Sequence, residues 1–294
     1  NLASYATALT IDASALDAAN KDNDADGDID SSDSSAEKLV ITGTASKALT
    51  VTGGSSDDTI IGSSDAAAGD TLKGGAGADT FTMGAGNLTY LDTIDGGTGT
   101  DIITAAQDVS DVDFMNVTNV ETLTINEAAG TSTNTLGAYV NSSGLATVNL
   151  DPDNVSTIRA NGTTGNINYV MKNIPASDDL AEDVQAGLGD DSLTVTGTAQ
   201  LKADDTFDGG AGTDTIIINN SGAATIDAKL NLITNVEKIV VKDNDGGDTV
   251  GSENADVINI TISGTGSGIA TDNSTDNADV AIEIDASVIT DTND

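Results

Sequence analysis

The sequence predicts an all-β fold in which short parallel β-roll, or solenoid, segments are combined with β-sandwich-like strands. Three observations predict it: a glycine-rich motif recurs along the chain, glycine is frequent throughout, and the apolar residues are mostly small or β-branched. Hydrophobic residues make up 37% of the 294 residues, with 32 Gly and only 2 Pro. This composition suits many short strands joined by tight turns, because β-branched side chains favour extended backbone and glycine permits sharp reversals.

The charge balance limits the partners and the chemistry of the chain. Asp and Glu number 48 against 10 Lys and Arg, which gives a net charge of −38. Binding to nucleic acid is excluded because phosphates need Lys and Arg, and anionic lipid surfaces repel such a chain. The absence of Cys and His excludes disulfides, zinc sites built on these residues and His-based catalysis. The remaining metal donors are oxygens, which favour hard cations, calcium before the others.

A nine-residue period organises the strongest motif. Three segments read G-G-x-G-x-D-x-apolar, namely Gly74–Phe81, Gly96–Ile103 and Gly209–Ile216. The glycines supply the positive φ of a turn, and the next three residues form a short strand whose central apolar side chain points inward. Two nine-residue halves close one coil, and stacked coils hold calcium between Asp oxygens and backbone carbonyls. The predicted ligand residues, including an Asp nine residues before each motif Asp, are Asp70, Gly75, Gly77, Asp79, Asp92, Gly97, Gly99, Asp101, Asp205, Gly210, Gly212 and Asp214.

These segments resemble the RTX nonapeptide of type I-secreted bacterial proteins. The resemblance implies a parallel β-roll loaded with several Ca²⁺ ions and secretion to the outside of the cell. Weaker copies begin at Gly53, Gly187 and Gly251, and for these a calcium site and a metal-free turn stay open as equal alternatives. Asp58 and Asp191 are the predicted ligands of the first two. We expect β-roll segments near 50–105 and 186–220, and either a sandwich or a broad solenoid at 106–180 and 221–294.

A longer repeat surrounds the nonapeptides. Asn-Val-Glu occurs at residues 119–121 and again at residues 235–237, each time after a strong nonapeptide. The segments Leu9–Ala15 and Ile282–Val288 also resemble each other. The predicted division is therefore a first repeat unit at 1–125, a second at 126–241, and the start of a third at 242–294. The combination of a nonapeptide followed by Asn-Val-Glu, lying between β-rich stretches, resembles RTX-type S-layer and large surface proteins.

An acidic loop lies inside the first unit. Residues 22–33 carry acids at loop positions 1, 3, 5, 7, 9 and 12, with Gly27 at position 6. An EF-hand-type loop needs early side-chain oxygens, a sharp turn at glycine and a closing acid at position 12. The loop resembles dockerin-type calcium loops, although its closing acid is Asp and not Glu. The predicted ligands are Asp22, Asp24, Asp26, Asp28, Asp30 and Asp33.

The function predicted from these features is structural. We expect a self-assembling S-layer or filament subunit on the bacterial cell surface, whose partner is itself, through terminal strands and calcium bridges. Cell-surface polysaccharide is a second candidate partner. Adjacent acids occur without a partner base, so no enzyme is expected, and no apolar stretch is long enough to span a membrane. The alternatives are an RTX-type adhesin or biofilm-matrix segment and, third, the secretion module of a type I-secreted enzyme.

Overall fold

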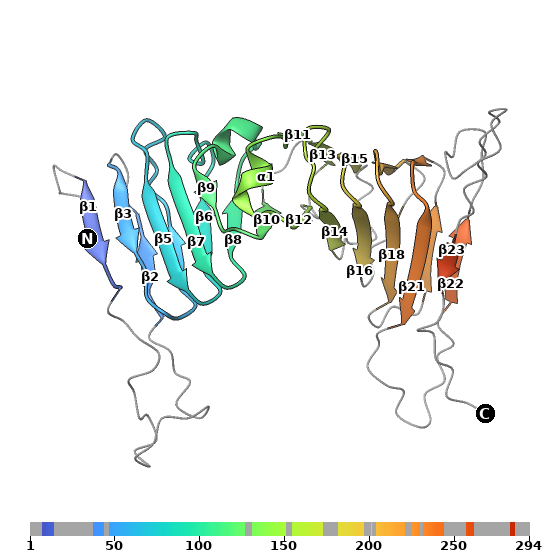
Figure 1. The fold of residues 1–294 in the computed structure, drawn as a ribbon, viewed down its shortest axis with the longest axis horizontal. Helices are drawn as coiled ribbons and strands as arrows, with labels where there is room; N and C mark the ends of the chain where they lie inside the picture. The colour runs from blue at the N-terminus through green and yellow to red at the C-terminus, as the bar shows by residue number, and fades with distance from the viewer. Residues whose placement is uncertain are drawn as a thin grey trace, which may run out of the picture. The chain divides into compact units, whose positions relative to one another are not determined.

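The computed structural model describes residues 8–14, 38–43, 47–126, 131–150, 155–172, 182–196, 201, 204–220, 225–229, 232–243, 257–261 and 283–285. The secondary structure of these residues is almost entirely β, and they fall into two compact units (Figure 1). Unit 1 is drawn from Asn1–Ala128 and Ala138–Leu145, and unit 2 from Ala129–Gly137 and Ala146–Asp294.

Unit 1 is a solenoid of two parallel sheets, because consecutive strands along most of the chain alternate between them. One sheet has the order β1 (Leu9–Asp12), β3 (Leu49–Thr52), β5 (Thr71–Ala76), β7 (Thr93–Thr98) and β9 (Val117–Thr118). The other contains β2 (Val40–Thr42), β4 (Thr59–Ile61), β6 (Thr80–Met83), β8 (Ile102–Ala105) and β10 (Thr122–Ile125). A 3-10 helix, η2 (Asp111–Phe114), and a one-turn helix, α1 (Val140–Ser143), lie in connections of this unit.

The core of unit 1 is formed by the central residue of each short strand. Phe81 in β6 lies opposite Ile60 of the preceding turn and Ile103 of the following turn, and all three are fully buried. Leu72 occupies the matching inward position of the other sheet and is also fully buried. Side chains alternate between the two sides of a strand, so the residues before and after each of these point outward.

Unit 2 repeats the same architecture. One sheet has the order β11 (Thr131–Thr135), β13 (Val155–Arg159), β15 (Asp183–Gln185), β17 (Thr206–Asp208) and β20 (Ile233–Thr234). The other contains β12 (Thr147–Asn149), β14 (Asn168–Lys172), β16 (Ser192–Thr196), β18 (Thr215–Asn220), β21 (Lys238–Asp243) and β23 (Glu283–Asp285). A separate pair joins β19 (Thr225–Lys229) to β22 (Val257–Thr261). Tyr169 and Phe207 meet edge to face in the core, with ring centroids 6.2 Å apart.

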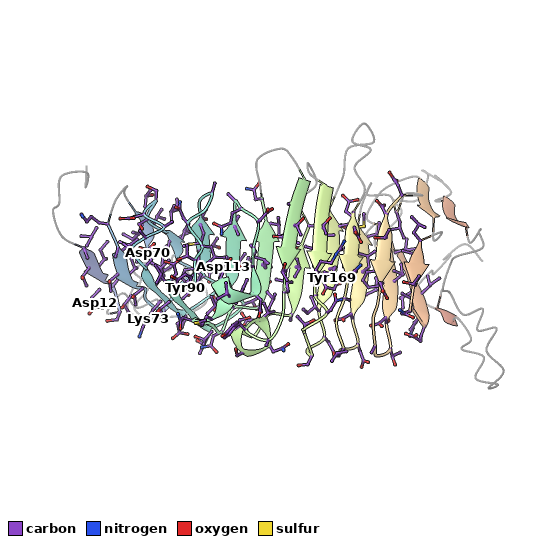
Figure 2. All side chains as sticks on the ribbon, turned by 90° about the horizontal axis from the view of Figure 1, so that it is seen from above. Asp12, Asp70, Lys73, Tyr90, Asp113 and Tyr169 are labelled. Carbon is purple, nitrogen blue, oxygen red and sulfur yellow. The ribbon has the colours of Figure 1, made fainter. Side chains whose placement is uncertain are left out.

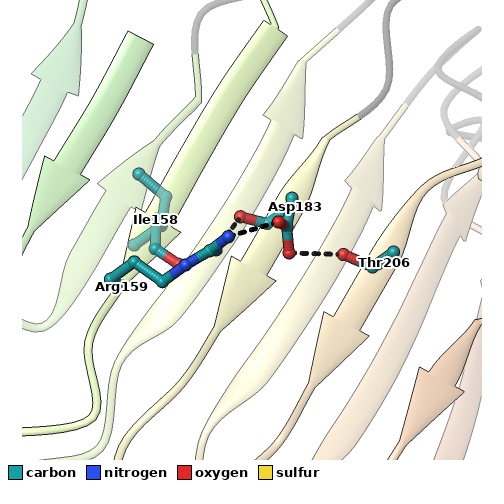
Figure 3. Close-up of polar contacts among 4 residues, drawn as sticks. All are labelled: Ile158, Arg159, Asp183 and Thr206. Carbon is teal, nitrogen blue, oxygen red and sulfur yellow. Dashed lines mark hydrogen bonds and ion pairs between the residues drawn. The ribbon is translucent and has the colours of Figure 1, made fainter.

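A polar contact crosses three successive turns on the outside of unit 2. The Arg159 guanidinium donates to the Asp183 carboxylate, which also accepts the hydroxyl of Thr206 at 2.6 Å (Figure 3). Burial alone would raise the pKa of Asp183, but the hydrogen bonds from Arg159 and Thr206 bring it below its ordinary value. The pair is partly exposed, so its contribution to stability is small.

The predicted parallel β-roll is confirmed and extends well beyond the two expected clusters. Of the two arrangements left open for 106–180, the structure has the broad solenoid, because the strand pairs described there are parallel. The described strands of 221–294 also pair in parallel. The sandwich-like strands are therefore facing sheets of a solenoid and not an antiparallel sandwich. The division into units at 125 and 241 stays a prediction.

Candidate metal centre

A row of carboxylates runs along one edge of unit 1, at the turns that lead into β4, β6, β8 and β10. The Asp58 carboxylate accepts the N–H of Leu39 at 2.7 Å, and the Asp79 carboxylate accepts the N–H of Asp58 at 2.7 Å. Asp101 accepts the N–H of Asp79 at 2.7 Å, and Glu121 accepts the N–H of Asp101 at 2.8 Å. Each carboxylate thus binds the backbone of the equivalent residue one turn earlier, which fixes the stacking of the turns.

The same row recurs in unit 2 with the same direction. Asp191 accepts the N–H of Ile167 at 2.7 Å, and Asp214 accepts the N–H of Asp191 at 2.7 Å. Glu237 closes the row by accepting the N–H of Asp214 at 2.7 Å. Among the residues that the structure describes, both units therefore build the row from Asp and end it with Glu.

The closing residues Glu121 and Glu237 were missed as site residues by the sequence reasoning. They belong to the repeated Asn-Val-Glu motif, whose position after a strong nonapeptide was the signal that could have identified them. The motif residues Asn119 and Asn235 both have a φ of 52°, a conformation that Asn tolerates better than most residues. Their side chains donate to an aspartate one turn earlier, so the motif acts as a terminating turn of the row.

The strong nonapeptides leave one carboxylate oxygen without a partner. Asp79, Asp101 and Asp214 are at most 1% exposed, and the Oδ2 atom of each makes no hydrogen bond. Their Oδ1 atoms are the ones used in the row. A buried anionic oxygen without a donor is costly unless a cation neutralises it.

The weak nonapeptides differ at this same atom. The Oδ2 of Asp58 accepts the N–H of Gly54 at 2.9 Å, and the Oδ2 of Asp191 accepts the N–H of Gly187 at 3.0 Å. Both oxygens of these two carboxylates are therefore engaged by backbone donors. Their turns close without an ion, which favours the metal-free alternative for these copies.

The electrostatics of the strong copies are compatible with a missing positive charge, but burial also raises the pKa of Asp191 in a weak copy, so the unpartnered oxygen is what separates the two classes. Burial, reinforced by the neighbouring carboxylates of Asp101 and Asp58, raises the pKa of Asp79 to about 7. Burial likewise raises the pKa of Asp214 to about 7 and raises the pKa of Asp101. A hard cation beside these oxygens would hold them ionised.

The glycines of the strong copies bring neighbouring turns into close contact. A Cβ on Gly97 would lie 2.0 Å from the Gly75 carbonyl oxygen, and one on Gly99 would lie 1.9 Å from the Gly77 carbonyl oxygen. The predicted positive φ is confirmed at Gly75 (114°), Gly77 (111°), Gly97 (105°), Gly99 (142°), Gly210 (91°) and Gly212 (141°). Within the described ranges no three acidic side chains gather as a metal cluster. The strong copies fit calcium only if backbone carbonyls complete its coordination shell, since calcium takes six to eight oxygens.

A second row runs along the other edge of unit 1 and is fully engaged. Asp70, which Figure 2 labels, accepts the N–H groups of Leu49 and Ser63, both at 2.7 Å. Asp92 accepts the N–H of Asp70 at 2.7 Å and that of Thr89 at 2.8 Å. These aspartates hold the connections between strands in place by accepting backbone hydrogen bonds. Their role as calcium ligands stays a prediction.

Unit 2 repeats part of this second row. Asp205 accepts the N–H of Glu182 at 3.2 Å, and its predicted ligand role also remains open. Glu182 stands nine residues before Asp191, the offset that separates Asp70 from Asp79, and it is 2% exposed. A spacing of two Asp residues does not include this position, because the acid here is Glu.

Two predicted calcium segments fall outside the described residues. They are the acidic loop Asp22–Asp33 and most of the weak copy that begins at Gly251. Both stay predictions.

Comparison with known proteins agrees with the geometry at the three strong copies and also matches the weak copy at Asp58. The RTX calcium-binding nonapeptide repeat matches four times, at residues 50–66, 67–87, 89–108 and 202–217. The last three matches contain Asp79, Asp101 and Asp214, and the first contains Asp58. No curated protein and no solved structure matched the chain. The chain therefore carries RTX-type repeats, which bind calcium, within a parallel β-solenoid. None of the helices in the described part of the chain has the length and apolar character needed to cross a membrane.

Proposed function

We propose that this chain is a calcium-dependent structural protein of the bacterial cell surface that assembles with its own copies into an S-layer or an extracellular filament. The observation that carries the proposal is the set of buried, unpartnered oxygens of Asp79, Asp101 and Asp214. They occur in both units and at separate turns. Ions distributed along a solenoid stiffen it as a whole, whereas a catalytic metal site would gather its ligands at one cleft.

A need for calcium would confine stable folding of this chain to the outside of the cell. With a net charge of −38 the compact state repels itself, and each bound ion offsets two of these charges. Calcium is abundant outside cells, so a secreted chain would become rigid only after export. The expected localisation is therefore extracellular.

The described end strands offer a route to polymerisation. β1 pairs only with β3, and β23 pairs only with β21, so each is an edge strand of its sheet within the described residues. Open edges are templates for pairing with another chain, and a contact between different ends propagates because it does not close.

Electron microscopy and light scattering of the purified chain test the proposal. Ordered sheets or fibres are expected in millimolar calcium, with dispersed chains after EGTA. A chain that binds calcium yet stays monomeric at high concentration would contradict self-assembly. Retention on a cell-surface polysaccharide by that monomer would then favour the adhesin or biofilm-matrix alternative.

A further inference from the structure

The two weak nonapeptides that precede a strong copy carry a second acid, which the carboxylate row does not use. Asp57 stands directly before Asp58, and Asp190 stands directly before Asp191. Both of these additional side chains are exposed, and we call Asp57 and Asp190 the outer aspartates. The same motif position is uncharged in the other copies, where it holds Ala78, Thr100, Thr213 and Ala255.

Each outer aspartate is held against the turn of the next strong copy. Oδ1 of Asp57 accepts the N–H of Ala78 at 2.7 Å, and Oδ1 of Asp190 accepts the N–H of Thr213 at 2.8 Å. Ala78 and Thr213 directly precede the first strong aspartate of their unit. An exposed carboxylate therefore lies beside a carboxylate whose Oδ2 atom is buried and makes no hydrogen bond.

The hydrogen bond at this place does not need a charged acceptor. One turn earlier in unit 2, the side-chain oxygen of Asn166 accepts the N–H of Asp190 at 2.8 Å. That turn stacks on the weak copy of Asp191, which has backbone donors for both carboxylate oxygens. The outer aspartates instead stand before Asp79 and Asp214, which each keep an oxygen without a donor. The stacking of the turns explains the hydrogen bond but not the charge.

We infer that the outer aspartates strengthen calcium binding at the first strong copy of their unit, at Asp79 and at Asp214, by placing a carboxylate charge beside it from the preceding turn. The weak aspartates of that turn cannot supply a free oxygen, because both oxygens of Asp58 and Asp191 accept backbone N–H groups. Additional negative charge near a hard cation raises its affinity. The inference rests on the calcium binding in the proposed function and not on self-assembly.

The electrostatics of both places agree with this role. Burial is the largest cause of the raised pKa of Asp79, and the charge of Asp57 adds to it. Burial is likewise the largest cause of the raised pKa of Asp214, and the charge of Asp190 adds to it. The Coulomb interaction that disfavours a second anion at these places favours a cation there.

A calcium titration of the full chain, followed by hydrogen exchange resolved along the sequence, tests the inference. Peptides that cover residues 74–81 and residues 209–216 report a calcium midpoint for each strong copy separately. Asp57→Asn removes the charge and keeps an acceptor oxygen, so it should raise the midpoint at 74–81 roughly 3- to 10-fold and leave that at 209–216 unchanged. Asp190→Asn should have the reverse effect.

Asp65 provides a matched control in unit 1. It is partly exposed and its Oδ1 atom accepts a backbone N–H, from Ala67 at 3.2 Å, but it lies in the connection between β4 and β5 and at no strong copy. Asp65→Asn should leave both midpoints within about twofold of the wild type. A shift as large as that of Asp57→Asn would mean that net charge matters and its place does not, which would overturn the inference.

Salt separates a role of charge from a structural role. Exposed charges are screened beyond about 3 Å in ~1 M salt, so the difference between the wild type and Asp57→Asn should shrink in ~1 M KCl. A difference that salt leaves unchanged would overturn the inference. If calcium protects neither turn of the wild type, calcium binding and this inference fail together. Protection of the wild type with unchanged midpoints in both outer-aspartate variants would overturn the inference alone.

Discussion

The strong and weak nonapeptides build the same carboxylate row and differ at a single oxygen atom. In the strong copies Oδ2 of Asp79 is buried without a donor, whereas in the weak copies Oδ2 of Asp58 accepts the N–H of Gly54. The row itself is therefore a structural device that needs no metal. The prediction of a metal at the strong copies rests on the second carboxylate oxygen, which has no hydrogen-bond partner there.

The backbone conformation explains why the two classes diverge. The residue four positions before the aspartate is Gly75 in a strong copy, with a φ of 114°, and Gly54 in a weak copy, without positive φ. The corresponding Gly210 donates its N–H to Asp208, at 3.2 Å, and not to the aspartate of its own motif. With positive φ, the N–H of this glycine is not donated to Oδ2 of the motif aspartate. The position beside Oδ2 is therefore open to a cation.

The largest effect expected is that of calcium removal. Without calcium the strong copies hold buried, unneutralised oxygens, so the turns around Asp79, Asp101 and Asp214 should open and the strand signal in circular dichroism should fall. Hydrogen exchange should show the fastest gain at these turns and a slower one at Asp58 and Asp191. Unchanged spectra and an unchanged melting temperature in EGTA would contradict calcium-dependent folding.

Replacing the motif aspartate by asparagine should affect a strong and a weak copy differently. Asp79→Asn removes a buried charge but keeps Oδ1 as acceptor for the Asp58 N–H, so it should raise the melting temperature in EGTA and lower it in calcium. It should also reduce the calcium stoichiometry by at least one ion.

The matched change Asp58→Asn should behave differently. It loses the acceptor for the Gly54 N–H, so it should destabilise the protein by about 1 kcal/mol with or without calcium and leave the stoichiometry unchanged. Calorimetric titration measures both variants. Equal calcium loss in the two would show that the weak copy also binds.

The pH dependence should change sign with calcium. The pKa values of Asp79 and Asp214 are raised to about 7 from an ordinary 3.8, so the folded chain binds protons more tightly than the unfolded chain between these values. The stability of the calcium-free protein should therefore fall as pH rises from about 4 to about 7. In calcium, stability should rise over the same range because the ions need ionised ligands.

Melting temperatures of dialysed protein at pH 5 and pH 8, with and without added calcium, measure this crossing. The double variant Asp79→Asn, Asp214→Asn is the control, and its calcium-free slope should be smaller. Parallel slopes in the two conditions would argue against metal at these residues.

The smallest effect is expected at the terminating glutamates. Glu121→Ala leaves the Asp101 N–H without its acceptor and should cost about 1–2 kcal/mol of unfolding free energy. Glu121→Gln retains an acceptor oxygen and should remain close to the wild type. Urea unfolding in calcium compares the two, and an equal loss for both would mean that the charge of Glu121 matters more than its hydrogen bond.

The repeat period allowed most of the solenoid to be predicted from the sequence. Each nine residues supply a turn and a strand with one inward apolar residue, so the period alone predicts that Leu72 and Phe81 lie in the core, where both are fully buried. The extent of the solenoid was underestimated, because 106–180 lacks the glycine motif and its strands are recognisable only through their parallel pairing with neighbours. The terminating role of Glu121 was likewise hidden, since it depends on a hydrogen bond 20 residues back along the chain.

The sequence by itself determined the parallel β-roll around the nonapeptides, the calcium chemistry and the aspartates of the carboxylate row, because these follow from local period and composition. Only the tertiary structure decided which copies keep an oxygen free for a cation. Gly187 and Gly189 occupy the same motif positions as Gly210 and Gly212, yet only the latter pair adopts positive φ. Glycine permits both conformations at little cost, so its presence cannot select between them. The stacking of each turn on its neighbours makes that choice.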